Sequence, residues 1–118
     1  MSDKYDGVLE SIADGVSGFI GASIVDLESG MPLATKASRD FDLDTASAYN
    51  SELVKAKLNT MRILGLTGLE DMLLTLESQL HLIKLVGKDA FIYVAADRQS
   101  TNLALLRSAV NRAADGLA

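Results

Sequence analysis

The side chains that could carry out chemistry are few in this chain of 118 residues. It has one histidine, His81, and no cysteine. A histidine-based triad or a multi-histidine metal site would therefore depend on a single residue, and a thiolate metal site is excluded. His81 alternates with Ile83 and Leu85 at strand spacing, where a lone histidine more often fills a sheet face or an interface than acts as a catalyst. We expect no catalytic residue.

Three aspartates at every second position, Asp40, Asp42 and Asp44, have spacing that could be mistaken for part of a calcium loop. The glycine and the final bidentate glutamate of an EF-hand loop are missing. We interpret the cluster as solvated charge that caps a helix. No metal site is expected.

The glycines do not form a phosphate-binding loop. A Gly-x-x-x-x-Gly-Lys-Ser/Thr motif that includes Gly87 would need a glycine at position 82, which is leucine, and Asp89 stands where the Ser or Thr belongs. The glycines near the first strand follow a helix and lack the dinucleotide-binding spacing. Gly21 is expected to lie in a strand where a helix packs closely. The sequence predicts no cofactor.

Composition narrows the possible partners. The net charge is −5 and the basic residues are scattered singly, so nucleic acid and anionic membrane surfaces are poor partners. No apolar run approaches the roughly 18 residues of a membrane span, and the polar, acidic N-terminus is unlike a signal peptide. With 48% hydrophobic residues, we expect one soluble, cytoplasmic domain over residues 1–118.

Hydrophobic periodicity and turn signals predict the order α-β-β-α-β-β-β-α. Asp26 can bond the backbone two residues on, and Gly30 can take the left-handed conformation that the first hairpin turn needs. The strands are apolar on both faces, so the sheet must be covered on both faces. We expect helices over residues 4–15, 42 or 44 to 64, and 101–116 (capped by Ser100), and strands over 19–26, 31–36, 69–77, 79–86 and 90–96.

The long helix has a wider apolar sector than one sheet requires. We therefore expect it to contact two surfaces, but the pattern does not say which cluster faces the sheet. One apolar cluster is Ala46, Tyr49, Leu53, Ala56 and Ile63; the other is Leu43, Val54, Leu58 and Met61; the polar side carries Ser51, Glu52, Lys55, Asn59 and Arg62.

This order of elements resembles the Roadblock/LC7 family, small dimeric proteins that regulate small Ras-like GTPases or serve as light chains of larger assemblies. The resemblance covers nearly the whole chain, and its best-matching segments are Ile24-Val25-Asp26, Gly30, Leu33-Ala34 and Asn102-Leu103 with Leu106-Arg107. It implies a profilin-like α/β (α+β) sandwich, in which a five-stranded antiparallel sheet has the long helix on one face and the two terminal helices on the other. It also implies a non-enzymatic homodimer, with paired long helices and with sheets joined through the third strand.

Two alternative functions stay open beside GTPase regulation, and two sets of residues are candidates for the dimer and partner contacts. One alternative is a structural adaptor or light-chain scaffold without a GTPase partner. The other is a small ligand-sensing domain with a pocket between sheet and helix. The candidate dimer interface is Val54, Leu58, Met61, Met72 and Leu74, and the candidate partner surface is Glu52, Lys55, Asn59 and Arg62.

Overall fold

The computed structural model of the chain describes residues 3–117. Within this range the elements follow the predicted α-β-β-α-β-β-β-α order, and a short 3-10 turn (Asp115–Leu117) comes after the last helix. Their bounds are α1 (Asp3–Gly15), β1 (Phe19–Asp26), β2 (Pro32–Ala37), α2 (Leu43–Leu64), β3 (Asp71–Thr75), β4 (Gln79–Val86), β5 (Ala90–Asp97) and α3 (Leu103–Ala114).

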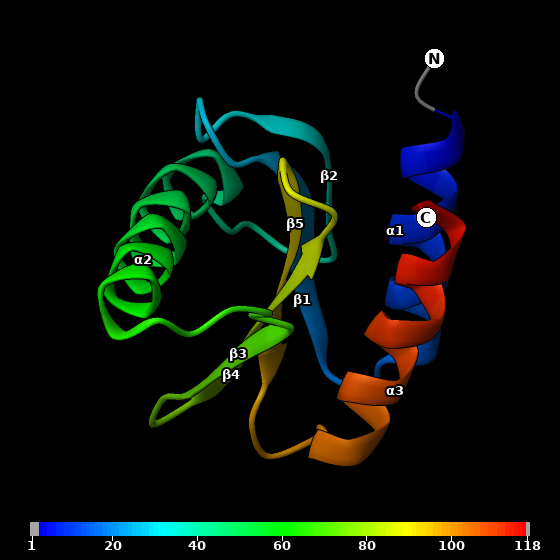
Figure 1. Cartoon of the computed structure of the whole chain (residues 1–118). Coiled ribbons are helices and arrows are strands. Elements are labelled where there is room, and N and C mark those ends of the chain that lie inside the picture. Colours follow the sequence, from blue (N-terminus) through cyan, green and yellow to red (C-terminus); the bar gives the residue numbers. More distant parts are fainter. Residues whose placement is uncertain (1–2, 118) are drawn as a thin grey trace.

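The elements form three layers (Figure 1). The five strands are all antiparallel, in the order β2-β1-β5-β4-β3, so β2 and β3 are the edge strands. The long helix α2 covers one face, and α1 and α3 cover the other (Figure 1). The predicted α+β sandwich is confirmed.

Two of the predicted elements, the third strand and the last helix, are shorter than predicted, and local hydrogen bonds explain where the helix begins. The third strand is shorter than predicted, because only Asp71–Thr75 pairs with β4. The last helix is capped by Asn102, whose side chain accepts a bond from the backbone N–H of Leu105 at 3.0 Å. Ser100 does not cap it, because its N–H and hydroxyl bind Asp97 instead. The α2 cap is as predicted, with Asp42 accepting from the N–H of Thr45 at 3.0 Å.

The first hairpin is close to the prediction. Gly30 has a left-handed φ of 75°. Asp26 accepts a backbone bond from Ser29, three residues on and not two. The β1–β2 register shifts between Ile24 and Val25. A Cβ on Gly21 would lie 3.4 Å from the Leu43 side chain, so the predicted close approach of a helix is confirmed.

Each face of the sheet has its own apolar core. One core joins α1 and α3 to the strands, with Leu9, Ile12, Leu106 and Val110 among its buried members. The other lies beneath α2 and includes Phe91, Tyr93 and Ile83 among others. Between residues 4 and 117 no buried side-chain nitrogen or oxygen lacks a hydrogen-bond partner. The buried polar side chains are thus hydrogen-bonded, and the packed sheet fixes the position of α2.

Candidate protein interaction surface

Helix α2 is seated on β1 through small hydroxyl side chains. The buried Ser47 and Ser23 hydroxyls lie 2.9 Å apart, and the Ser51 hydroxyl donates to the Leu27 carbonyl at 2.6 Å. Serine is small enough to let a helix approach a strand, and each hydroxyl is satisfied there. The same side of α2 buries Leu43, Val54 and Met61. This side faces the sheet.

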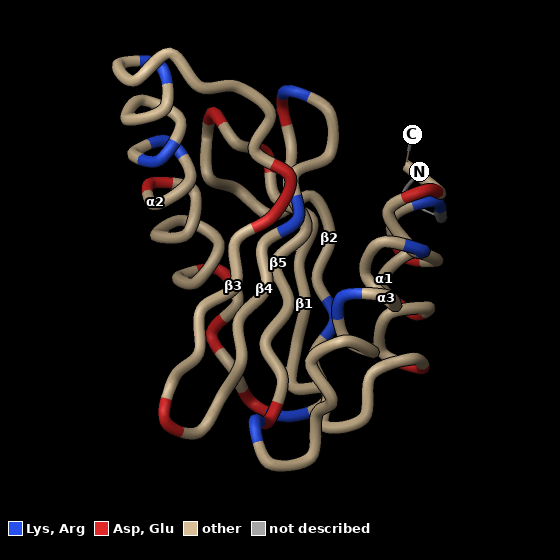
Figure 2. The backbone as a smooth tube through the Cα atoms, turned by 60° about the horizontal axis from the view of Figure 1, so that its bottom comes forward, with Lys and Arg blue, Asp and Glu red and all other residues tan. Residues whose placement is uncertain are grey.

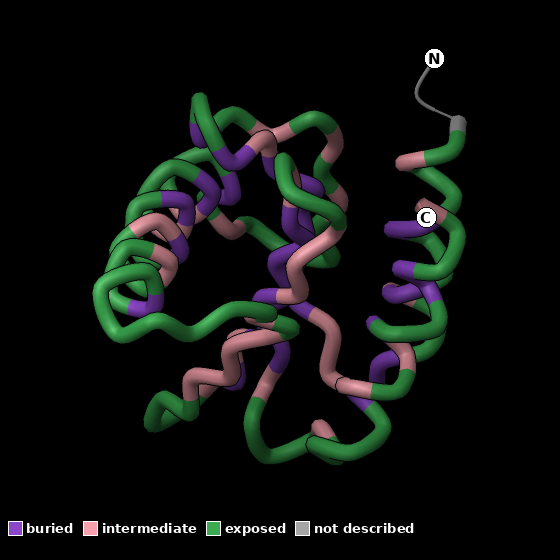
Figure 3. The backbone as a smooth tube through the Cα atoms, in the orientation of Figure 1, coloured by how far each residue is buried: buried purple, intermediate pink, exposed green. Residues whose placement is uncertain are grey.

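The structure decides which of the two apolar clusters is left uncovered. Tyr49, Leu53 and Ile63 are exposed to 74%, 37% and 68% of their areas, and Ala56 between them is also exposed. Figure 3 shows the outer side of α2 in green, in contrast to the purple stretches that face the sheet. We call Tyr49, Leu53, Ala56 and Ile63 the apolar flank of α2.

The predicted dimer residues lie mainly on the opposite side. Val54 has no exposed area and Met61 is buried, so the chain's own core already uses both side chains. Leu58, Met72 and Leu74 pack partly buried against the same core beneath α2. This corrects the assignment of Val54, which has no surface to offer a partner. The dimer interface itself stays a prediction, and the apolar flank is its more accessible part.

The four predicted partner-surface residues come together along a second, polar flank of α2. Lys55 Nζ donates to the Glu28 carbonyl at 2.8 Å and lies 3.6 Å from the Glu52 carboxylate. Arg62 donates to the Asn59 side chain at 2.7 Å. The Glu28 contact places this flank toward the β1–β2 turn. Figure 2 shows acidic and basic positions together on α2. Ser51, expected beside these residues, is instead buried and bonded to the Leu27 carbonyl just after β1.

The two flanks look in different directions. At about 100° per residue, the apolar flank is centred roughly 100° around α2 from the polar flank and points mainly away from the sheet. The exposed Leu64 and Leu66 extend this apolar surface into the loop that leads to β3. The uncovered apolar side chains of α2 therefore form a solvent-facing surface that continues into the loop before β3.

One helix is too narrow to cover this face of the sheet. Five strands at a spacing of about 4.8 Å span roughly 20 Å, whereas a helix with its side chains covers about 10 Å. Because α2 lies over β1, the outer strand β3 is left without a helix of its own, and Met72 and Leu74 are only half-buried. The α2 side of the β3 edge has room for a second helix.

His81 is the one imidazole of the chain, and its contacts are structural. Its Nε2 lies 2.7 Å from Gln79 Oε1, its Nδ1 lies 3.2 Å from the Tyr93 hydroxyl, and Phe41 meets the ring edge-on. Burial lowers the pKa of His81 and raises the pKa of Tyr93 to about 12. Nothing in this arrangement activates a nucleophile.

The described residues hold neither a metal-binding cluster nor a membrane-spanning helix. Over residues 4–117 no three His, Cys, Asp or Glu side chains gather as a metal ion would require. In the same part of the chain, no helix combines the length and the apolar character needed to cross a lipid bilayer.

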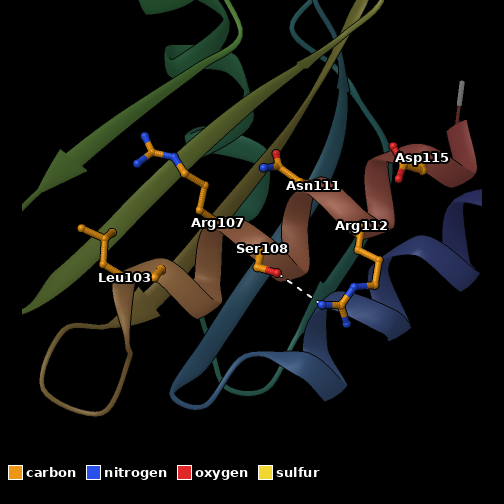
Figure 4. Close-up of a pocket in the computed structure, with 7 residues that line it drawn as sticks. Leu103, Arg107, Ser108, Asn111, Arg112 and Asp115 are labelled. Carbon is orange, nitrogen blue, oxygen red and sulfur yellow. Dashed lines mark hydrogen bonds between the residues drawn. The ribbon is translucent and has the colours of Figure 1, made fainter.

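A surface hollow lies on the other side of the sheet, away from these residues. It is an open trough of about 800 Å³ along the outside of α3. Figure 4 shows Arg107 reaching from α3 toward the strands and Arg112 reaching toward α1. Arg112 donates a hydrogen bond to the Ser108 hydroxyl of the same helix. The lining comes from α3 and from Asp115 in the turn that follows it, so the trough is a surface feature and no enclosed ligand cavity between helix and sheet.

Solved structures share this fold over nearly the whole chain. MglB from Myxococcus xanthus superposes with a TM-score of 0.88 at 17% identity, covering 98% of this chain and 92% of that one. The gliding protein MglB from Thermus thermophilus gives 0.86 at 20% identity, with 98% and 86% covered. A Roadblock/LC7 domain from Streptomyces avermitilis gives 0.83 at 16% identity, with 95% and 92% covered. No family model and no curated protein matches the sequence. The chain therefore has the Roadblock/LC7 fold.

Proposed function

We propose that this chain, which has the Roadblock/LC7 fold, is a non-enzymatic cytoplasmic regulator that forms a homodimer and binds a small Ras-like GTPase. The observation that carries the proposal is the exposed apolar flank of α2, together with the edge position of β3 in the sheet. Contiguous exposed apolar surface of this kind marks interaction sites in soluble proteins. The GTPase partner comes from the family resemblance.

A two-fold contact through β3 would cover both features at once. Pairing the β3 edges of two copies makes one continuous sheet and places both α2 helices on the same face. Two-fold symmetry makes these helices antiparallel. Ala56 lies midway between Tyr49 and Ile63 in the sequence, so Tyr49 of one copy would lie near Ile63 of the other. The small Ala56 side chain at the centre allows a close crossing.

The polar flanks remain outside such a helix pair and form a surface for the GTPase. Glu52, Lys55, Asn59 and Arg62 would appear twice on a symmetric platform, on which one asymmetric partner can sit. These residues mix both charge signs, which favours orientation and fast encounter over high affinity. Binding should be moderate and sensitive to salt, and should depend on the nucleotide if the GTPase switch regions take part.

Reversal of both charges on the polar flank tests the GTPase surface. Small Ras-like GTPases from the same genome are loaded in turn with GDP and with a non-hydrolysable GTP analogue, and binding is measured by calorimetry. The Lys55→Glu/Arg62→Glu variant should bind at least about tenfold more weakly, because loss of two charged contacts costs about 1.4 kcal/mol or more. The self-association of the variant should be unchanged.

A matched control separates the surface from the overall charge. Lys4→Glu/Arg112→Glu changes the net charge equally but lies on the α1 and α3 side of the sheet. Equal weakening by both variants would show a nonspecific charge effect and would argue against the polar flank. If no GTPase binds in either nucleotide state, the adaptor interpretation replaces this one.

A further inference from the structure

The edge strand β3 is held at its first residue by a side chain from the opposite layer. Arg107 of α3 donates from Nε to Asp71 Oδ2 at 2.8 Å and from Nη2 to Asp71 Oδ1 at 3.0 Å. Within residues 4–117 this is the salt bridge that joins a helix to β3. Otherwise β3 is attached by its ladder with β4 and by the half-buried Met72, Leu73 and Leu74, which pack against the two cores.

The geometry of this pair makes it a firm attachment. Both guanidinium donors meet both carboxylate oxygens, which fixes direction as well as distance. The Asp71 side chain is only 20% exposed. The hydrogen bonds from Arg107 lower the pKa of Asp71, although burial acts in the opposite direction. The carboxylate therefore stays charged and bound at neutral pH.

In the segment before β3, Leu69 is the residue that packs partly buried against the core beneath α2. Between α2 and β3 the chain passes through Gly65 and Gly68, both at positive φ, and through the exposed Leu66. One backbone bond, from the Leu85 N–H to the Glu70 carbonyl at 3.0 Å, continues the ladder beyond Asp71. An edge strand that starts from such a loop frays easily when its first residue is released.

We infer that Arg107 is a positioning residue that holds β3 ready as a pairing edge, so that the Arg107–Asp71 pair sets how strongly two copies associate. This inference rests on the proposed dimer through β3. A strand that is already ordered loses less conformational entropy when a second copy pairs with it. Removal of the pair moves that cost into the association step.

Arg107 variants test the inference with two independent readouts. Hydrogen exchange of the β3 backbone amides reports the order of the strand in the free chain, at protein concentrations where the chain is monomeric. Sedimentation equilibrium reports the dissociation constant of the dimer. Arg107→Gln should speed exchange in β3 and weaken association roughly tenfold, the size expected for a lost charged hydrogen-bond pair.

Exchanging the two charges distinguishes the pair from a general role of Arg107 in α3. The double variant Arg107→Asp/Asp71→Arg should recover part of both effects, and Arg107→Lys should lie between wild type and Arg107→Gln because it keeps the charge without the bidentate geometry. Arg112→Gln, in the same helix but with its hydrogen bond to Ser108 rather than to β3, is the matched control and should leave β3 unchanged.

The experimental results test the inference and the existence of the proposed dimer separately. If the β3 amides exchange hydrogen at the same rate in Arg107→Gln and in Arg112→Gln, the inference is overturned. It is also overturned if Arg107→Gln speeds exchange in β3 without weakening association. If the wild type stays monomeric at every concentration, the proposed dimer fails and the link to association fails with it, whereas the exchange data still show whether Arg107 orders β3.

Discussion

At the scale of single residues, buried polar side chains decide how α2 sits. Ser47 and Ser51 lie on the sheet-facing side of the helix and bind Ser23 and the Leu27 carbonyl. By polarity alone, Ser51 resembles the charged residues around it, which is why the sequence pattern put it on the outer side. Its small size, which allows close packing on β1, was the better signal. Serines beside an apolar cluster can thus mark the buried side of a helix.

We predict that His81 makes the stability of the protein depend on pH. Burial lowers its pKa in the folded state, so between the lowered value and about 6.5 the unfolded chain binds more protons. Stability should therefore be full above about pH 6.5 and decrease as the pH falls through that window, by at most about 1.4 kcal/mol per pH unit. Urea unfolding from pH 8 to pH 5, at fixed protein concentration, measures this slope.

His81→Gln is the comparison variant for this slope. With one histidine and no cysteine in the chain, few other groups titrate in this range. The variant is expected to lose most of the slope, whatever its absolute stability, while carboxylate effects below about pH 5 persist. An unchanged slope would mean that His81 is as easily protonated in the folded chain as in the unfolded chain.

At the scale of elements, the α1–β1 and β5–α3 connections lock together around Gly18. Its φ is 81°, and a Cβ there would lie 2.6 Å from Thr101 Oγ1 and 2.9 Å from Ser100 Oγ. Neither hydroxyl can turn away freely, because Thr101 bonds the Ser17 carbonyl and Ser100 bonds Asp97. This glycine is needed for space as well as for conformation.

We predict that Gly18→Ala destabilises the fold by ~3 kcal/mol, the sum of a left-handed backbone cost and the loss of packed hydrogen bonds. Gly87→Ala is the control, because Gly87 also has a positive φ (63°) but a Cβ there would meet no atom within 4 Å beyond its chain neighbours. It should cost only ~1 kcal/mol. Chemical denaturation of both variants measures the difference, and equal losses would show that space at Gly18 is unimportant.

At the scale of the whole molecule, neighbouring α2 residues have opposite surroundings. Leu53 belongs to the apolar flank and is 37% exposed, whereas Val54 is fully buried against the sheet. The same charged substitution at the two positions should therefore affect two different processes. Their comparison reports on association and folding separately.

We predict that the wild type has a mass near twice 12.5 kDa in light scattering at micromolar concentration, and that Leu53→Asp lowers it toward the monomer while keeping a cooperative fold. Val54→Asp should instead unfold the chain, because an unpaired charge is buried at a cost of several kcal/mol. Circular dichroism and light scattering measure both properties. A monomeric wild type, or a Leu53→Asp protein that remains dimeric, would contradict the proposed interface.

The order of the elements could be predicted from local signals along the chain. Asp42 and Gly65 delimit α2 because a cap needs only its nearest neighbours, and Gly30 enforces the first turn for the same reason. The β4 limits follow from alternation between two turns. Such features depend on contacts a few residues apart, so the sequence alone determined them.

The interaction surface depended on tertiary structure. Periodicity separated the two apolar clusters of α2, but only the placement of the helix on β1 decided that Val54 is covered and Tyr49 is not. The sequence pattern also could not predict the end of β3 or its attachment by Arg107, because Asp71 and Arg107 are far apart in the sequence and meet across two layers. Burial and long-range pairing are properties of the assembled molecule, and local sequence patterns do not encode which of two similar faces turns inward.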